Sequence, residues 1–154
     1  MNQIINEKVK SKISEDLSPT RNLTGIHLKI VASIAIIWSL FQLWYASPFP
    51  FMFNIGMFKG LPARAIHLGF ALTLAFLIYP ISKKKKISTF DILISFVAAF
   101  SCLYIYFFYD QLVDRGGMLL SIAVGEEFNL PVELIIGSCG ILILLEATRR
   151  AIGL

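Results

Sequence analysis

The chain has 154 residues, of which 56% are hydrophobic and 13% aromatic, with a mean hydropathy of +0.73 and a formal net charge of +4. This composition excludes an ordinary soluble domain and predicts a membrane protein. The basic residues form short clusters between apolar runs, so they favour membrane topology over a nucleic-acid-binding surface.

Residues 1–29 are mostly polar and precede the first apolar run, which is not the pattern of a cleavable signal peptide. We assign them to an N-terminal cytoplasmic and interfacial segment. Apolar residues recur there every four positions, at Ile5, Val9, Ile13 and Leu17. The spacing predicts a short amphipathic helix at the membrane interface, and a solvated tail is the alternative.

Four apolar segments follow, at about residues 30–47, 63–80, 90–109 and 130–145. Each comes near the roughly 20 residues that a helix needs to cross a hydrocarbon core about 30 Å thick. Helices are expected because every backbone N–H and C=O must be satisfied within lipid. The predicted fold class is therefore all-α, an integral membrane protein whose four transmembrane helices occupy residues 30–145.

The loops assign an orientation to these spans. Eleven of the 14 Lys and Arg residues lie on the side of the chain termini, including the run at residues 83–86. The positive-inside rule then places both termini in the cytoplasm. The first outer loop, residues 48–62, carries four Phe and two Met but is broken by Pro and Gly, so it predicts a segment on the outer membrane surface or a protein-docking surface.

Three ionisable residues, Arg64, His67 and Glu133, fall within about one turn of the outer interface. An ionisable group in a span is costly unless it is paired, so we predict that Arg64 or His67 pairs with Glu133. A proton or ion site at Glu133 is the rival interpretation. His27 and His67 lie on opposite sides and cannot share a metal or haem, so no cofactor, metal site or enzyme activity is predicted.

The fourth span ends in "LEATRR", where Glu146 can pair with Arg149 or Arg150 at the cytoplasmic surface. We expect residues 146–154 to form a cytoplasmic turn that leads into a further helix. Three stretches, "SLFQLWYAS", "RAIHLGFAL" and "LEATRRAIG", occur in this order. Over about residues 21–154 the chain resembles the small, four-helix Q part of fused permeases of TRAP transporters, the tripartite ATP-independent periplasmic carriers, in their TAXI branch.

The resemblance implies a sodium symport system of the bacterial or archaeal cytoplasmic (inner) membrane. It implies two partners, a large permease (M) part, fused or separate, that binds sodium and substrate, and a periplasmic substrate-binding protein. This chain would be the scaffold, and it would also contact the lipid bilayer. No nucleic-acid partner is expected. The motif positions carried over are Arg64, His67, Glu146, Arg149 and Arg150. The alternative function is a small self-assembling, proton-coupled transporter that uses Glu133.

Overall fold

The computed structural model describes residues 20–21, 23–58, 60–81, 87–116, 118–124 and 128–152. The predicted amphipathic helix at residues 5–17 and the lysine run at residues 83–86 lie outside these ranges.

Four long helices make up most of the described chain: α2 (Gly25–Ala46), α4 (Gly60–Ile78), α5 (Thr89–Asp114) and α6 (Val132–Ile152). A short helix, α3 (Phe49–Phe53), follows α2. Helices α2, α4 and α5 are long and apolar enough to cross a membrane. The predicted class, a multi-pass helical membrane protein, is confirmed at this level.

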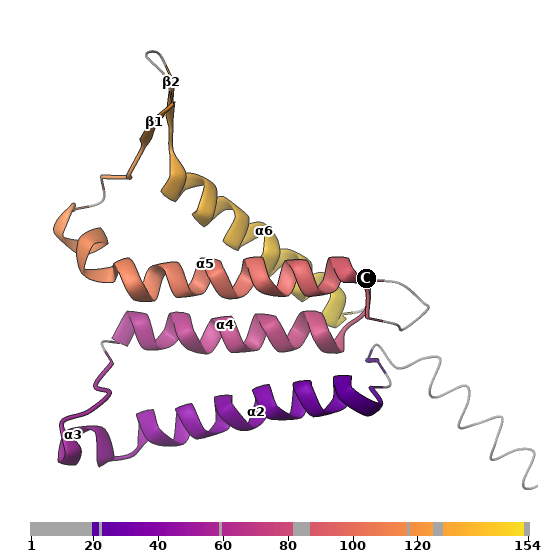
Figure 1. The fold of residues 1–154 in the computed structure, drawn as a ribbon. Helices are drawn as coiled ribbons and strands as arrows, with labels where there is room; N and C mark the ends of the chain where they lie inside the picture. The colour runs from indigo at the N-terminus through magenta and orange to yellow at the C-terminus, as the bar shows by residue number, and fades with distance from the viewer. Residues whose placement is uncertain are drawn as a thin grey trace, which may run out of the picture.

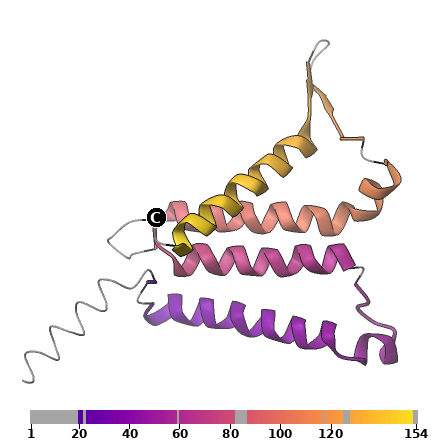
Figure 2. The ribbon, with the colours of Figure 1, turned by 180° about the vertical axis from the view of Figure 1, so that it is seen from behind.

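The helices alternate in direction. Figure 1 shows α4 between α2 and α5, and α4 packs against both neighbours. Seen from both sides, α6 crosses the α4–α5 pair obliquely and packs against each of them (Figures 1 and 2). The starts of α2 and α5 and the ends of α4 and α6 therefore gather at one end of the molecule, which we call the Asp91 end. We call the opposite end, where α3 lies, the α3 end.

Two apolar clusters hold this arrangement together. One joins α4, α5 and α6 through the buried residues Leu72, Phe76, Ala98, Cys102 and Ala147. The other joins α2 to α4 through Val31, Leu74 and Leu77. Helices α4 and α5 approach closely at Gly69, where an added Cβ would lie 3.2 Å from the Cβ of Cys102. A small residue at this point lets the two helices pack closely.

The helix ends differ from the predicted spans. Helix α2 begins at Gly25 rather than Ile30, and α5 continues to Asp114. Helix α6 continues to Ile152, so the turn expected at residues 146–154 is wrong as far as the described chain extends. In the sequence alone, the charges after Leu145 predict the end of a helix. They instead pair at helical spacing, which supports the helix through its last turns.

The connection between α5 and α6 contains a feature that the apolar pattern did not predict. Strands β1 (Ile122–Val124) and β2 (Phe128–Leu130) pair in antiparallel fashion, with Ile122 opposite Leu130. Each strand has three residues, which is too short for a period-two pattern to stand out. The hairpin projects beyond the start of α6 (Figure 1).

Candidate functional site

A buried group of charges joins four segments at the Asp91 end. Asp91 is fully buried in the first turn of α5. Its Oδ2 accepts a hydrogen bond from Arg21 at 2.6 Å, and its Oδ1 accepts one from Arg150 at 2.7 Å. Arg21 also donates through its side chain to the carbonyl oxygen of Leu77 and through its backbone N–H to that of Ile78. The carboxylate of Asp91 thus connects the segment before α2, the start of α5 and the end of α6. Through its bonds to Leu77 and Ile78, Arg21 also connects this group to the end of α4.

Local sequence places Asp91 where it can do this. The N–H of Phe90 donates to Ser88 Oγ at 3.3 Å, and the N–H of Ser88 donates to Asp91 Oδ2 at 3.2 Å, which forms a capping box. A capping box satisfies backbone donors that the helix start leaves unpaired, and a carboxylate there also interacts favourably with the helix dipole. The same carboxylate therefore caps α5 and pairs with two arginines.

The group extends along the last turns of α6. Glu146 accepts hydrogen bonds from Arg149 at 2.8 and 2.9 Å and from Arg150 Nε at 2.7 Å. The predicted pairing of Glu146 with one of these arginines is confirmed, and both take part. Arg150 also lies over the ring of Phe76, with its Cζ 4.9 Å from the ring centroid. Arg150 therefore contacts Glu146, Asp91 and Phe76 at once.

The arginines of this group have more donors than the described residues satisfy. Arg21 Nε and Arg150 NH2 are buried, and neither has a hydrogen-bond acceptor in the described part of the chain. The side chains of both arginines are 1% exposed. Because a buried charge is costly unless it is paired, the fold depends on the carboxylate between them.

Glu146 lies at the more exposed edge of this group, after the predicted fourth span. Hydrogen bonds from Arg149, followed by those from Arg150, lower the pKa of Glu146 from 4.5 to about 2. A carboxyl group whose pKa is lower in the folded chain stabilises the fold fully above its unfolded pKa. That contribution is lost as the pH falls from about 4.5 through about 2.

The Glu146→Gln variant should therefore show a pH-dependent difference from the unmodified chain. Near neutral pH it should melt at a lower temperature, because the paired carboxylate is gone. The difference should shrink as the pH falls from about 4.5 to about 2, since the unmodified carboxylate then also becomes neutral. Thermal unfolding in detergent micelles over this range measures it. Thr148→Ala, on the same exposed turn, is the control, and a Glu146→Gln difference that does not change with pH contradicts the prediction.

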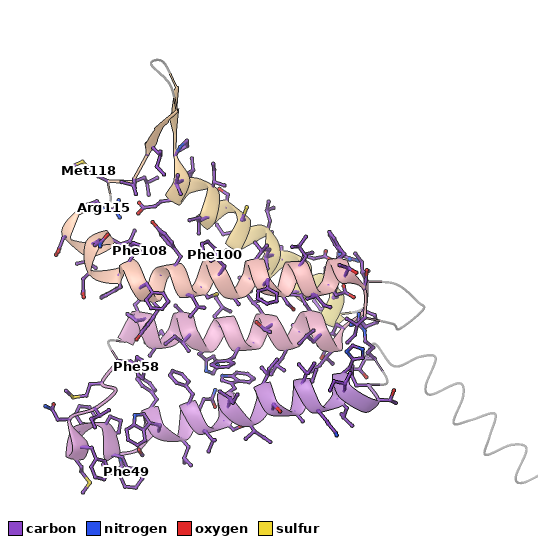
Figure 3. The ribbon with its side chains drawn as sticks, viewed as in Figure 1. Phe49, Phe58, Phe100, Phe108, Arg115 and Met118 are labelled. Carbon is purple, nitrogen blue, oxygen red and sulfur yellow. The ribbon has the colours of Figure 1, made fainter. Side chains whose placement is uncertain are left out.

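A second ion pair lies at the start of α6. The carboxylate of Glu133 accepts hydrogen bonds from the guanidinium of Arg115, from the hydroxyl of Tyr104 at 3.0 Å and from the backbone N–H of Leu120 at 2.7 Å. The side chain of Glu133 is 3% exposed and that of Arg115 is 27% exposed. Figure 3 shows Arg115 beside the first turn of α6. Glu133 therefore joins the start of α6 to α5 and to the loop that follows α5.

This arrangement corrects the predicted partner of Glu133. In the described ranges, no ion pair joins Arg64 or His67 to Glu133, because Arg115, Tyr104 and Leu120 occupy the carboxylate. Arg64 is exposed near the start of α4. The prediction assumed that span 2 lies beside the start of span 4, whereas α6 meets α4 mainly through residues near its own end, such as Ala147.

His67 instead connects α4 to α2. Its Nδ1 lies 2.7 Å from Gln42 Nε2 and 3.3 Å from Trp38 Nε1, which donates to it. The rings of Trp38 and His67 also meet edge to face, with centroids 5.0 Å apart. Within helices of a membrane protein, such side-chain hydrogen bonds contribute to helix association. The "RAIHL" motif thus supplies a helix–helix contact.

Sequence reasoning missed four members of these groups: Arg21, Asp91, Tyr104 and Arg115. Asp91 carried a usable signal, since an acidic residue three positions after Ser88 at the start of an apolar run predicts a capping box. An ionisable residue within a predicted span is also a functional hypothesis in its own right. Arg21, Tyr104 and Arg115 carried no local signal, because their partners lie 70, 29 and 18 residues away in the chain.

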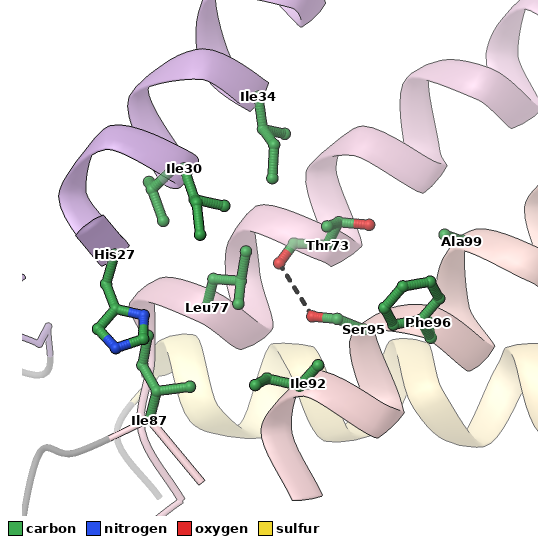
Figure 4. A pocket seen from close by; sticks show the side chains of 11 residues that line it. His27, Ile30, Ile34, Thr73, Leu77, Ile87, Ile92, Ser95, Phe96 and Ala99 are labelled. Carbon is green, nitrogen blue, oxygen red and sulfur yellow. Dashed lines mark hydrogen bonds between the residues drawn. The ribbon is translucent and has the colours of Figure 1, made fainter. Parts of the chain in front are cut away.

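The face of α4 and α5 away from α6 carries an apolar groove (Figure 4). The groove has a volume of about 400 Å³, and its wall includes Val31, Ile34, Leu77, Ile92 and Phe96. The hydroxyl of Ser95 donates to the carbonyl oxygen of Thr73 across it, at 3.3 Å. A second pocket of about 190 Å³ shares Ile34, Thr73 and Ala99 with the first and extends the groove along α4. His27 is at the edge of the groove toward the Asp91 end.

The described residues contain no group of three or more His, Cys, Asp or Glu side chains that could hold a metal ion. The ionisable side chains brought together are arranged as intramolecular ion pairs near the ends of α5 and α6. Comparison of the chain with protein-family models, with curated proteins and with solved structures gave no match.

Proposed function

We propose that this chain is the small scaffold component of a sodium-driven, TRAP-type solute importer. In this proposal it packs against a large membrane permease part, which binds sodium and substrate, and works with a periplasmic substrate-binding protein. The family assignment rests on the three motifs given above. The scaffold role rests on the arrangement of charges in the fold.

One observation carries the scaffold role. Asp91 and Glu133 are each engaged by at least three hydrogen-bond donors from the chain itself. A transport site needs polar groups that can exchange their partners, and such groups in membrane proteins usually mark ion or substrate pathways. Here the buried carboxylates connect helices to one another, which favours a supporting role.

We propose that α6 crosses the membrane as the fourth span and that both termini face the cytoplasm. Helix α6 has 21 residues; its apolar part lies before Glu146, and its charged last turns would lie at the cytoplasmic interface. The lysine and arginine distribution of the sequence supports this orientation. The Asp91 group would then lie near the cytoplasmic surface and α3 near the outer surface.

The groove on the face opposite α6 is the surface that we propose for packing against the permease part. Its walls are almost entirely apolar, and the small side chain of Ala99 leaves room for a close approach. Helices associate in membranes through close packing at small residues, because lipid tails already satisfy apolar side chains. An apolar helix of the partner could follow α4 from Ile66 to Leu77.

Co-expression with a TRAP-type permease part and its binding protein tests the proposal. Three sets of vesicles are compared, with this chain, with the permease part, or with both, each under an inward sodium gradient. The solute is a carboxylate that the binding protein binds. Uptake is expected only with both membrane components. Uptake by this chain alone would overturn the scaffold role and would favour the proton-coupled alternative if Glu133→Gln then abolished it.

A matched pair of variants tests the groove. Ala99→Trp fills the floor of the groove and should reduce copurification with the permease part. Leu142→Trp changes a 65%-exposed apolar residue on α6, on the other face, and should leave copurification unchanged. Equal behaviour of the two variants would show that the partner does not use the groove.

A further inference from the structure

The segment after α2 has a defined shape, set by a few local interactions. Ser47 Oγ donates to the carbonyl oxygen of Trp44 at 2.8 Å and accepts from the N–H of Phe49 at 3.3 Å. Pro48 and Pro50 lack the N–H groups needed to continue α2, yet proline is tolerated in the first turn of the new helix α3. Asn54 then ends α3 in the left-handed conformation, with φ of 53°.

An aromatic base holds this segment against the end of α2. The ring of Trp44 lies 6.3 Å from that of Phe49 and 6.5 Å from that of Phe53, centroid to centroid. Gly56 has a φ of 65°, and a Cβ there would lie 3.1 Å from Trp44 Nε1. Phe58, the last described residue of the loop, packs on Phe41. The loop therefore has an inner face built around Trp44, and α3 lies beyond the end of α2 (Figures 1 and 3).

Apolar side chains of the same segment are also widely exposed, and Phe53, which lies against Trp44, is itself 58% exposed. Phe51 is 76% exposed, Met52 70%, Ile55 66% and Met57 54%. Residues 47–58 include no charged side chain, and their polar side chains are those of Ser47 and Asn54 alone. An exposed apolar group of this kind on a folded segment marks contact with a membrane or with protein.

Two observations favour lipid over protein as the contact. The segment directly follows α2, a helix long and apolar enough to span a membrane, whose last turns also expose apolar side chains: Leu40 is 59% exposed and Leu43 67%. Protein interfaces typically carry about one hydrogen bond per 100–200 Å², and residues 48–58 offer few side-chain groups to make them. Aromatic residues at the end of a span are also typical of the membrane–water boundary.

We propose that residues 49–57 form an interfacial anchor that inserts Phe51, Met52, Ile55 and Met57 into the bilayer leaflet at the α3 end. The aromatic base fixes these side chains relative to α2, so their insertion sets the depth of α2 in the membrane. Apolar and aromatic side chains at the end of a span are well placed at the boundary between headgroups and acyl chains. Its insertion depends on the bilayer alone and not on the importer proposed above.

Spin labels on single cysteines test the anchor in the full chain. Cys102→Ala and Cys139→Ala provide the background, and Met52→Cys carries the label in vesicles of phosphatidylethanolamine and phosphatidylglycerol. Collisions with oxygen, which dissolves in lipid, should exceed those with a water-soluble nickel chelate several-fold. The depth obtained should be shallower than that of a label at Leu43→Cys, on the exposed side of α2. Met57→Cys provides a second reporter if the first variant does not fold.

Phe58→Cys is the matched control in the same loop. Phe58 is half-buried and packs on Phe41 and Tyr106, so its label should meet both reagents rarely. Easy access of nickel to the labels at Met52 and Met57 would show that the segment lies in water. Low access of both reagents at these two positions would show that protein covers it. Either result overturns the anchor, and neither bears on the importer assignment.

Discussion

Replacing Asp91 with alanine is expected to lower the free energy of unfolding by about 3–5 kcal/mol, the cost of removing one partner from a buried ion pair. The loss would leave the guanidinium groups of Arg21 and Arg150, both 1% exposed, without the carboxylate between them. It would also remove the capping box of α5. Reversible unfolding of the full chain in mixed micelles, followed by circular dichroism, measures the change.

Two controls separate burial from charge in this experiment. Asp91→Asn keeps the shape and one acceptor oxygen but removes the negative charge, so it should also destabilise strongly. Glu146→Gln removes a carboxylate that is 27% exposed in the same network and should have a much smaller effect. An Asp91→Ala variant that unfolds like Glu146→Gln would show that the buried group does not hold the helices together.

Replacing Glu133 with alanine is expected to release the loop between α5 and α6. Glu133 accepts from Arg115, Tyr104 and the backbone of Leu120, so its removal frees both Arg115 and Leu120 from the start of α6. Trypsin cleaves after arginine only where the backbone can open locally. Cleavage after Arg115 should become several-fold faster, as followed by mass spectrometry of a timed digest.

The same digest contains its own reference. Lys29 lies on α2, far along the chain from the Glu133 group, and cleavage after it should keep its rate if the effect is local. Ser138→Ala, an exposed change on α6, is the control variant. Equal acceleration at Arg115 and Lys29 would indicate global destabilisation, and no acceleration at Arg115 would show that Glu133 does not hold the loop.

Hydropathy predicted the long helices well, because burial in lipid demands a run of apolar residues that is contiguous in the chain. Each predicted span overlaps one long helix, and three of these helices are apolar enough to cross a membrane. The helix ends were predicted less well. Glu146, Arg149 and Arg150 end the apolar run and so predict the end of the helix. Their spacing equally fits a helix that continues, as α6 does.

The ion pairs between distant segments depend on which helices lie side by side, and no local sequence pattern contains that information. The sequence predicts Arg64 or His67 as the partner of Glu133, whereas in the fold, where α6 runs obliquely over the α4–α5 pair, Glu133 pairs with Arg115. Arg150 could be assigned to Glu146 from their four-residue spacing, whereas its bond to Asp91 spans 59 residues. The hairpin was missed for another reason: its strands pair locally, but with three residues each they are too short to show a period-two pattern.

The amino-acid sequence alone predicts a helical, apolar chain, the approximate positions of its long helices, and a pair between Glu146 and either Arg149 or Arg150 within one helix. Each of these follows from interactions between residues a few positions apart. The pairing of Asp91 with Arg21 and Arg150, and of Glu133 with Arg115, depends on the fold, because these contacts form between segments that the packing of the helices brings together.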